Sequence, residues 1–110
     1  MSTVSLPSNF YAIGDRAFNG CTSLVKITGS AKEIGSAAFN NTGLSSAFLP
    51  SGVLSVHYNA FSNCSKIVSA FIHSNIRYLG DSLFYNCQNL ADATVSAADG
   101  DAYAINARMF

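Results

Sequence analysis

The hydrophobic pattern of the chain repeats four times. Each copy holds an apolar residue, three spacers, a small or aliphatic residue and a phenylalanine. The four copies are Ile13 with Ala17 and Phe18, Ile34 with Ala38 and Phe39, Val56 with Ala60 and Phe61, and Leu79 with Leu83 and Phe84. Successive copies begin 21, 22 and 23 residues apart. Units this short bury their apolar faces only by stacking on one another, so the pattern predicts a repeat solenoid.

A second apolar pattern closes each unit. Three residues after each phenylalanine comes a column made up of Cys21, Thr42, Cys64 and Cys87. Apolar residues then follow at i, i+3 and i+5 from Leu24, Leu44, Ile67 and Leu90. The final spacing of two is typical of a strand with one buried face. We expect one short parallel strand per unit, with the inward residues Ile27, Leu49, Ile72 and Val95.

The opening half of each unit predicts a corner followed by a short helical turn. Positive φ is expected at Gly14, Gly35 and Gly80. Helix-capping residue types follow them at Asp15, Ser36 and Asp81. Residues that tolerate the left-handed conformation end the turn at Gly20, Asn41, Asn63 and Asn86. The small residue before each phenylalanine lets the coils approach, so Phe18, Phe39, Phe61 and Phe84 are expected to form a buried aromatic ladder.

Residues 13–27 read Ile-Gly-Asp-x-Ala-Phe-x-Gly-Cys-Thr-Ser-Leu-x-x-Ile, which resembles the BspA-type leucine-rich repeat. The resemblance covers nearly the whole chain. It implies a right-handed parallel β-solenoid over residues 1–110, with four full units and a half-unit at each end. It also implies a surface or extracellular protein that binds protein partners, as in adhesion. The family has no catalytic residues to assign, so the resemblance implies a non-enzymatic module.

Composition narrows the class of partner. Hydrophobic residues make up 49% of the chain and charged residues 11%, which excludes a disordered chain. Six basic and six acidic residues cancel, so no net charge attracts nucleic acid or anionic lipid. No apolar run is long enough to span a membrane, and residues 1–10 lack the features of a signal peptide. No spacing predicts a metal or cofactor site, because Cys-x-x-Cys is absent and the glycines fall in separate units.

The strand face holds the candidate partner site. In the predicted register Phe48 and Phe71 point to solvent side by side, with His73 close by and Ser46 and Ser69 beside them. Adjacent exposed aromatic side chains anchor protein interfaces. The alternative is cross-strand packing that only stiffens the sheet.

The cysteines and histidines carry weaker hypotheses. The three cysteines are expected to be small buried residues of one column, although Cys64 and Cys87 lie in adjacent units and a disulfide between them stays open. A nucleophilic pair of Cys64 with His57 or His73 needs an exposed thiolate, and we expect both histidines to be ordinary surface residues at corners. Two glycosylation sequons begin at Asn40 and Asn63 but fall in the turn column, so glycosylation is not expected.

The ends of the pattern predict a second kind of contact. Residues 1–7 fit a closing half-unit and residues 102–110 fit an opening half-unit. The residues expected to stack end to end are Met1, Val4, Leu6, Pro7, Ile105, Met109 and Phe110. Contact between unlike ends propagates into a filament when it does not close into a ring. The alternative is that the chain is part of a longer repeat protein.

Overall fold

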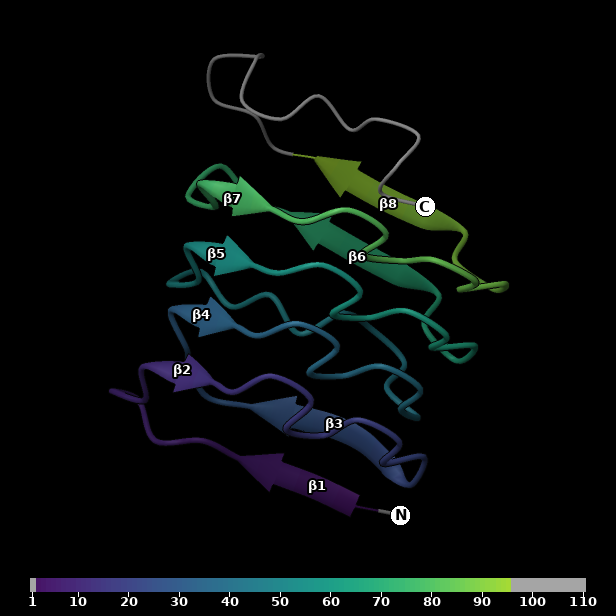
Figure 1. The fold of residues 1–110 in the computed structure, drawn as a ribbon, viewed down its shortest axis with the longest axis horizontal. Coiled ribbons are helices and arrows are strands. Elements are labelled where there is room, and N and C mark those ends of the chain that lie inside the picture. The colour runs from purple at the N-terminus through teal and green to yellow at the C-terminus, as the bar shows by residue number, and fades with distance from the viewer. Residues whose placement is uncertain (1, 96–110) are drawn as a thin grey trace.

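The computed structural model describes residues 2–95, which wind into a stack of coils with two columns of short strands (Figure 1). The strands are β1 (Ser2–Ser5), β2 (Ala12–Ile13), β3 (Leu24–Thr28), β4 (Glu33–Ile34), β5 (Ser55–Val56), β6 (Ser69–Ile72), β7 (Tyr78–Leu79) and β8 (Asp92–Val95). Every strand pair within the described residues is parallel. The predicted repeat fold is therefore confirmed, whereas its right-handed turn stays a prediction.

One column of strands is a continuous sheet in the order β2-β4-β5-β7. Its register joins Ile13 to Ile34, Ile34 to Val56 and Val56 to Leu79. The first three of these side chains are buried and Leu79 is half-buried, because the second residue of each strand points into the coil. We call this column the continuous sheet. It forms in the half of the unit where the sequence predicts only a corner, so the expectation of one strand per unit is wrong.

The other column is broken. β1 pairs with β3 and β6 pairs with β8, but no ladder joins β3 to β6 in the described chain. Residues 44–50 pass between them without forming a strand, and a single bridge joins Ser46 to Ser69 (Figure 1). We call the outer side of β1, β3, residues 44–50, β6 and β8 the strand-lined face. Val4 lies opposite Ile27, as expected for a closing half-unit at the N-terminal end.

The corners contain turns, and the described residues include no helix, so the predicted helical turn is wrong. Gly20, Asn41, Asn63 and Asn86 have positive φ as expected. A second column with positive φ consists of Arg16, Ala37, Asn59 and Ser82. In the first full coil the N–H groups of Arg16, Phe18 and Gly20 donate to carbonyls of the next coil at 2.8–2.9 Å. Asp15 also bonds the next coil, because its Oδ1 accepts from Ser36 N–H at 2.9 Å, and does not cap its own turn.

Two of the three corner glycines, Gly35 and Gly80, are required by close approach rather than by backbone angle. Gly14, Gly35 and Gly80 lack positive φ, so that expectation is wrong. A Cβ on Gly35 would lie 2.6 Å from the backbone nitrogen of Asp15, and one on Gly80 would meet the backbone of Tyr58. Nothing lies within 4 Å of the same position on Gly14.

The predicted ladder of stacked phenylalanines is present, with Phe39, Phe61 and Phe84 buried and Phe18 half-buried at its end. Phe18, Phe39, Phe61 and Phe84 stack with ring centroids 5.4, 5.4 and 5.8 Å apart and interplanar angles of 4–12°. A second ladder of side-chain amides runs along the turns: Asn86 donates to Asn63, Asn63 to Asn40, and Asn40 to Asn19, at 2.8–3.0 Å. Each ladder joins successive coils in register.

Candidate functional site: a groove in the strand-lined face

The break in the strand-lined face follows from the spacing of buried residues. Ile27 is the third residue after Leu24 and Ala70 the third after Ile67, and all four side chains are buried. In the unit between them the buried Phe48 is the fourth residue after the buried Leu44. Leu44 lies one position closer to Thr42 than Leu24 lies to Cys21, and Ser45 and Ser46, which follow it, are exposed. A one-residue change of register in an extended segment interrupts the ladder. No backbone hydrogen bond joins residues 25–29 to residues 44–50 in the described chain.

Phe48 points inward, so the prediction that it lies exposed beside Phe71 is wrong. It is 8% exposed and meets Phe39 edge to face, with centroids 6.1 Å apart and planes at 69°. Phe48 stands six residues after Thr42, as Ile27 stands six residues after Cys21. Counting from the Cys/Thr column would have placed it in the core. Leu49, predicted inward, is half-buried instead.

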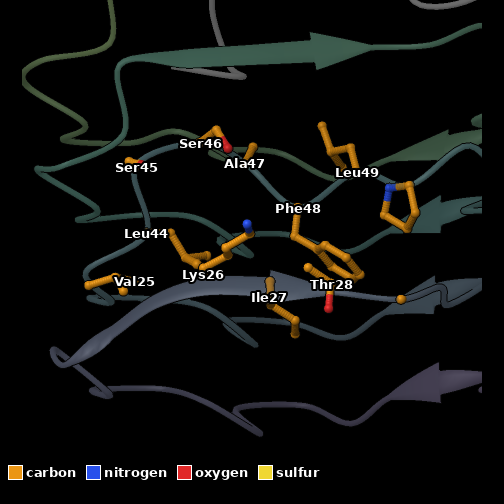
Figure 2. Close-up of a pocket in the computed structure, with 12 residues that line it drawn as sticks. Val25, Lys26, Ile27, Thr28, Leu44, Ser45, Ser46, Ala47, Phe48 and Leu49 are labelled. Carbon is orange, nitrogen blue, oxygen red and sulfur yellow. The ribbon is translucent and has the colours of Figure 1, made fainter. Parts of the chain in front are cut away.

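Between the two segments lies a groove of about 700 Å³. It is lined by residues 25–29 on one side and residues 44–50 on the other. Figure 2 shows the Phe48 side chain extending from its own segment toward Thr28 of β3. Lys26 is the one charged residue among those that line the groove, so the groove has a mainly uncharged surface with a single positive group at its rim.

The far side of residues 44–50 is fixed to β6. Val68 N–H donates to Ser45 O at 3.0 Å, and Ala47 N–H donates to Ser69 O at 3.3 Å. His73 bonds Pro50 O through Nε2 at 2.8 Å, while its Nδ1 accepts from Asn75 N–H at 3.2 Å. Because a carbonyl only accepts and a backbone N–H only donates, the His73 proton sits on Nε2. His73 is 9% exposed, which corrects the expectation of a surface residue. It positions one wall of the groove.

Phe71 is exposed on the strand-lined face, as predicted. It is 52% exposed, and Val68, which precedes β6, is 50% exposed. Ser46 and Ser69 form the bridge beside them. Of the five predicted partner-binding residues, Phe71, Ser46 and Ser69 thus lie at or near this face, whereas Phe48 and His73 are buried beneath it.

Sequence reasoning missed one aromatic contact at the continuous sheet. Tyr78 on β7 contacts His57, which follows β5, with ring centroids 5.3 Å apart, and Tyr78 is exposed. Tyr11 and Tyr58 are also exposed near this sheet. The pairing of β5 with β7 brings the two rings together, so only prediction of that sheet could have found the contact.

Cys64 is buried, but Cys21 is exposed and Cys87 is half-buried, so the expectation of three buried cysteines is wrong for two of them. Cys64 Sγ donates to Phe39 O and Cys87 Sγ to Phe61 O, both at 3.0 Å, so the thiols bond separate carbonyls and are free rather than joined in a disulfide. Thr42 Oγ1 lies 3.3 Å from Cys64 Sγ. Burial raises the pKa of Cys87 to about 11, which disfavours a reactive thiolate. Cys64 makes its hydrogen bonds to Phe39 and Thr42 rather than to a histidine, so the proposed nucleophilic pair is not assembled.

The remaining sequence features have structural roles or lie at the ends. The Nδ2 groups of Asn40 and Asn63, which glycosylation would modify, donate within the amide ladder. Val4 and Leu6 are half-buried and Pro7 is exposed. A hollow of about 420 Å³ beside Phe18 is lined by Val4 and residues of the first corner. The other residues predicted to stack, Met1, Ile105, Met109 and Phe110, lie outside the described residues, as does the side chain of Val95.

Short parallel coils of 21–23 residues with a shared apolar column define the class of leucine-rich-repeat solenoids. A family model described as BspA type leucine rich repeat region matches residues 1–110 in six copies. The chain therefore belongs to the BspA-type leucine-rich repeat family. No curated protein matches it. Within residues 2–95 the structure holds no helix long and apolar enough to cross a membrane, and no cluster of three or more metal-binding side chains.

Two solved structures are similar to the chain. A leucine-rich repeat protein from Bacteroides ovatus ATCC 8483 matches with a TM-score of 0.78 and 28% identity, over 86% of this chain and 25% of that one. A leucine rich cell surface protein from Faecalibacterium prausnitzii A2-165 matches with a TM-score of 0.43 and 18% identity, over 87% of this chain and 42% of that one. The chain thus spans about a quarter of the length of the Bacteroides protein.

Proposed function

We propose that the protein is a non-enzymatic interaction module that binds a protein partner through its strand-lined face, in adhesion at a cell surface. The observation that carries the proposal is the exposure of Phe71 and Val68, 52% and 50%, beside the groove. A large apolar side chain exposed on a strand, such as Phe71, supplies the anchor that a protein interface needs. Membership of a repeat family typical of protein-binding surface proteins supports the same function.

Binding to a panel of purified extracellular-matrix proteins, measured by surface plasmon resonance, tests this function. Phe71→Ser should weaken binding at least tenfold, because loss of an anchor side chain costs about 2 kcal/mol or more. Tyr85→Ser is the matched control, since Tyr85 is an equally exposed aromatic residue in a turn. Equal weakening by both variants, or no binding to any member of the panel, would contradict the proposal.

End-to-end stacking into filaments is the second candidate. Phe18 stacks on Phe39, and the hollow of about 420 Å³ beside it is lined by Val4 and Leu24. That hollow has room for the apolar end of another coil. Electron microscopy and sedimentation at several protein concentrations would reveal ordered fibres, and Phe18→Asp should abolish them. Discrete particles at every concentration would exclude this candidate.

A further inference from the structure

The exposed backbone edge of β3 lies in the groove. Leu6 N–H donates to Thr28 O, and Thr28 and Lys26 lie opposite Ser5 and Thr3 of β1. Because the N–H and C=O of successive residues in a strand point to opposite edges, the N–H and C=O of Ile27 and the N–H of Gly29 point away from β1. They face residues 44–50, to which no backbone hydrogen bond runs in the described chain.

From this edge we infer that the groove binds a short extended segment of a partner polypeptide, which pairs its main chain with Ile27 and completes the interrupted sheet. This inference rests on the proposed function and names the form of the partner. An edge that presents alternating donors and acceptors is matched by another peptide backbone, and strand addition is an established mode of peptide recognition. An anion would satisfy only the donors.

The shape of the groove limits the segment. At one end a Cβ on Gly43 would lie 2.5 Å from Thr22 O and 3.1 Å from Leu24 O, so the coils touch there. At the other end a Cβ on Gly52 would lie 3.3 Å from the Ser30 hydroxyl. A long strand cannot pass through both ends. The segment must therefore enter from solvent, pair over a few residues and leave again.

The charge at the rim selects the chemistry of the segment. Lys26 is exposed and is the one charged residue that lines the groove, so an acidic or uncharged segment is favoured over a basic one. Phe48 forms the apolar floor, since its ring lies below the opening against Phe39.

A variant that closes the groove provides the sharpest test. Leu44→Ser, Ser45→Leu and Phe48→Ile together restore the three-residue spacing of the neighbouring coils and a smaller inward side chain; we call this the regular-coil variant. It should pair residues 44–50 with β3 and remain folded. In the wild-type protein the probe is a displayed library of random heptapeptides, from which enriched peptides are synthesised and their affinities measured by calorimetry.

Enriched peptides should bind the wild-type protein and lose at least tenfold in affinity to the regular-coil variant. Methylation of one alternate set of peptide backbone nitrogens should weaken binding by a similar factor, while methylation of the other set should not. Hydrogen exchange at Ile27 should slow at least tenfold on binding, with the already bonded Gly35 amide unchanged. Lys26→Glu should shift the enriched sequences from acidic to basic.

Several results would overturn the inference. They are the absence of enriched peptides, equal binding by the regular-coil variant, insensitivity to backbone methylation, and self-association that the regular-coil variant abolishes, which would make a second copy the occupant. Protein binding that requires Phe71 but persists in the regular-coil variant would remove this inference and leave the proposed function standing. Peptide binding in the groove without Phe71-dependent protein binding would contradict the proposed role of Phe71 and leave the groove as the binding site.

Discussion

The continuous sheet and the strand-lined face are made by the same coils, yet only one of them is interrupted. In the continuous sheet β2, β4, β5 and β7 keep one register through all four coils. On the strand-lined face the ladder stops at residues 44–50, where the buried residues are spaced by four instead of three. The Phe ladder between the two sides stays stacked throughout.

This difference shows how locally a solenoid absorbs an irregular unit. Each coil contacts only its neighbours, so register is fixed separately along every column. The coil with the irregular spacing is held by Phe39 in the core and by Ser45 and Ala47 against β6. It therefore needs no pairing with β3. A one-residue change in spacing thus creates a binding groove without disturbing the other side of the molecule.

Alanine substitution of Phe48 and of Phe71 is expected to give the largest difference in stability between two residues of the strand-lined face. Phe48→Ala should lower the free energy of unfolding by about 3–5 kcal/mol, because it leaves a cavity beneath the groove. Phe71→Ala should change it by less than about 0.5 kcal/mol, since the side chain is half exposed. Urea unfolding followed by circular dichroism measures both. A loss below about 0.5 kcal/mol for both variants would show that the register predicted from sequence, with both rings exposed, is correct.

Alanine variants of the corner glycines test whether close packing of the coils stabilises the continuous sheet. Gly80→Ala should destabilise the protein by about 1–3 kcal/mol, because the added Cβ meets the backbone of Tyr58 and forces the coils apart. Gly14→Ala is the matched control, since nothing lies within 4 Å of its Cβ position, and it should be nearly neutral. Thermal unfolding of the two variants compares them directly. Equal effects would mean that close coil approach does not explain the glycine column.

Much of the fold could be predicted because residues at equivalent positions of successive units are of the same type and occupy the same place in each coil. The phenylalanine spacing predicts the aromatic ladder, and Gly20, Asn41, Asn63 and Asn86 predict the left-handed corner column. The second strand of each coil could not be predicted, because two-residue strands carry no periodicity that distinguishes them from a corner.

The candidate site was harder to predict than the fold. Phe71 was placed correctly by alternation, but Phe48 was aligned through Leu44 when its distance from Thr42 determines its side. A one-residue change of register reverses the face that a side chain occupies, and alignment through Leu44 gives a different register for Phe48 than alignment through Thr42. The groove exists because of this shift, so it follows from the structure alone.

Variants of Asn63 test how much the amide ladder stabilises the turns that connect the two sides. Asn63→Ala should cost about 2 kcal/mol, because it removes two side-chain hydrogen bonds and places alanine at a φ of 60°. Asn63→Gly keeps the backbone angle available and should cost about 1 kcal/mol. Chemical denaturation measures both values. If the two variants lose the same stability, the ladder alone accounts for the residue; if Asn63→Gly loses nothing, the backbone angle does.

The smallest expected effect concerns the Cys column beside those turns. Burial raises the pKa of Cys87 to about 11 from 9.0, so the folded protein holds this proton more tightly than the unfolded chain. Its contribution to stability is complete below pH 9 and is lost as the pH rises toward 11. Cys87→Thr is the matched variant, because threonine occupies the same column at position 42 and keeps a donor for Phe61 O.

The melting temperature should therefore decrease more between pH 7 and pH 10 for the wild-type protein than for Cys87→Thr. Iodoacetamide should label the exposed Cys21 faster than Cys87 at pH 8, and Cys87 labelling should rise about tenfold per pH unit up to its pKa. An equal alkaline loss in both proteins would show that Cys87 titrates alike in the folded and unfolded states. Partial burial would then not be raising the pKa of Cys87 in the folded protein.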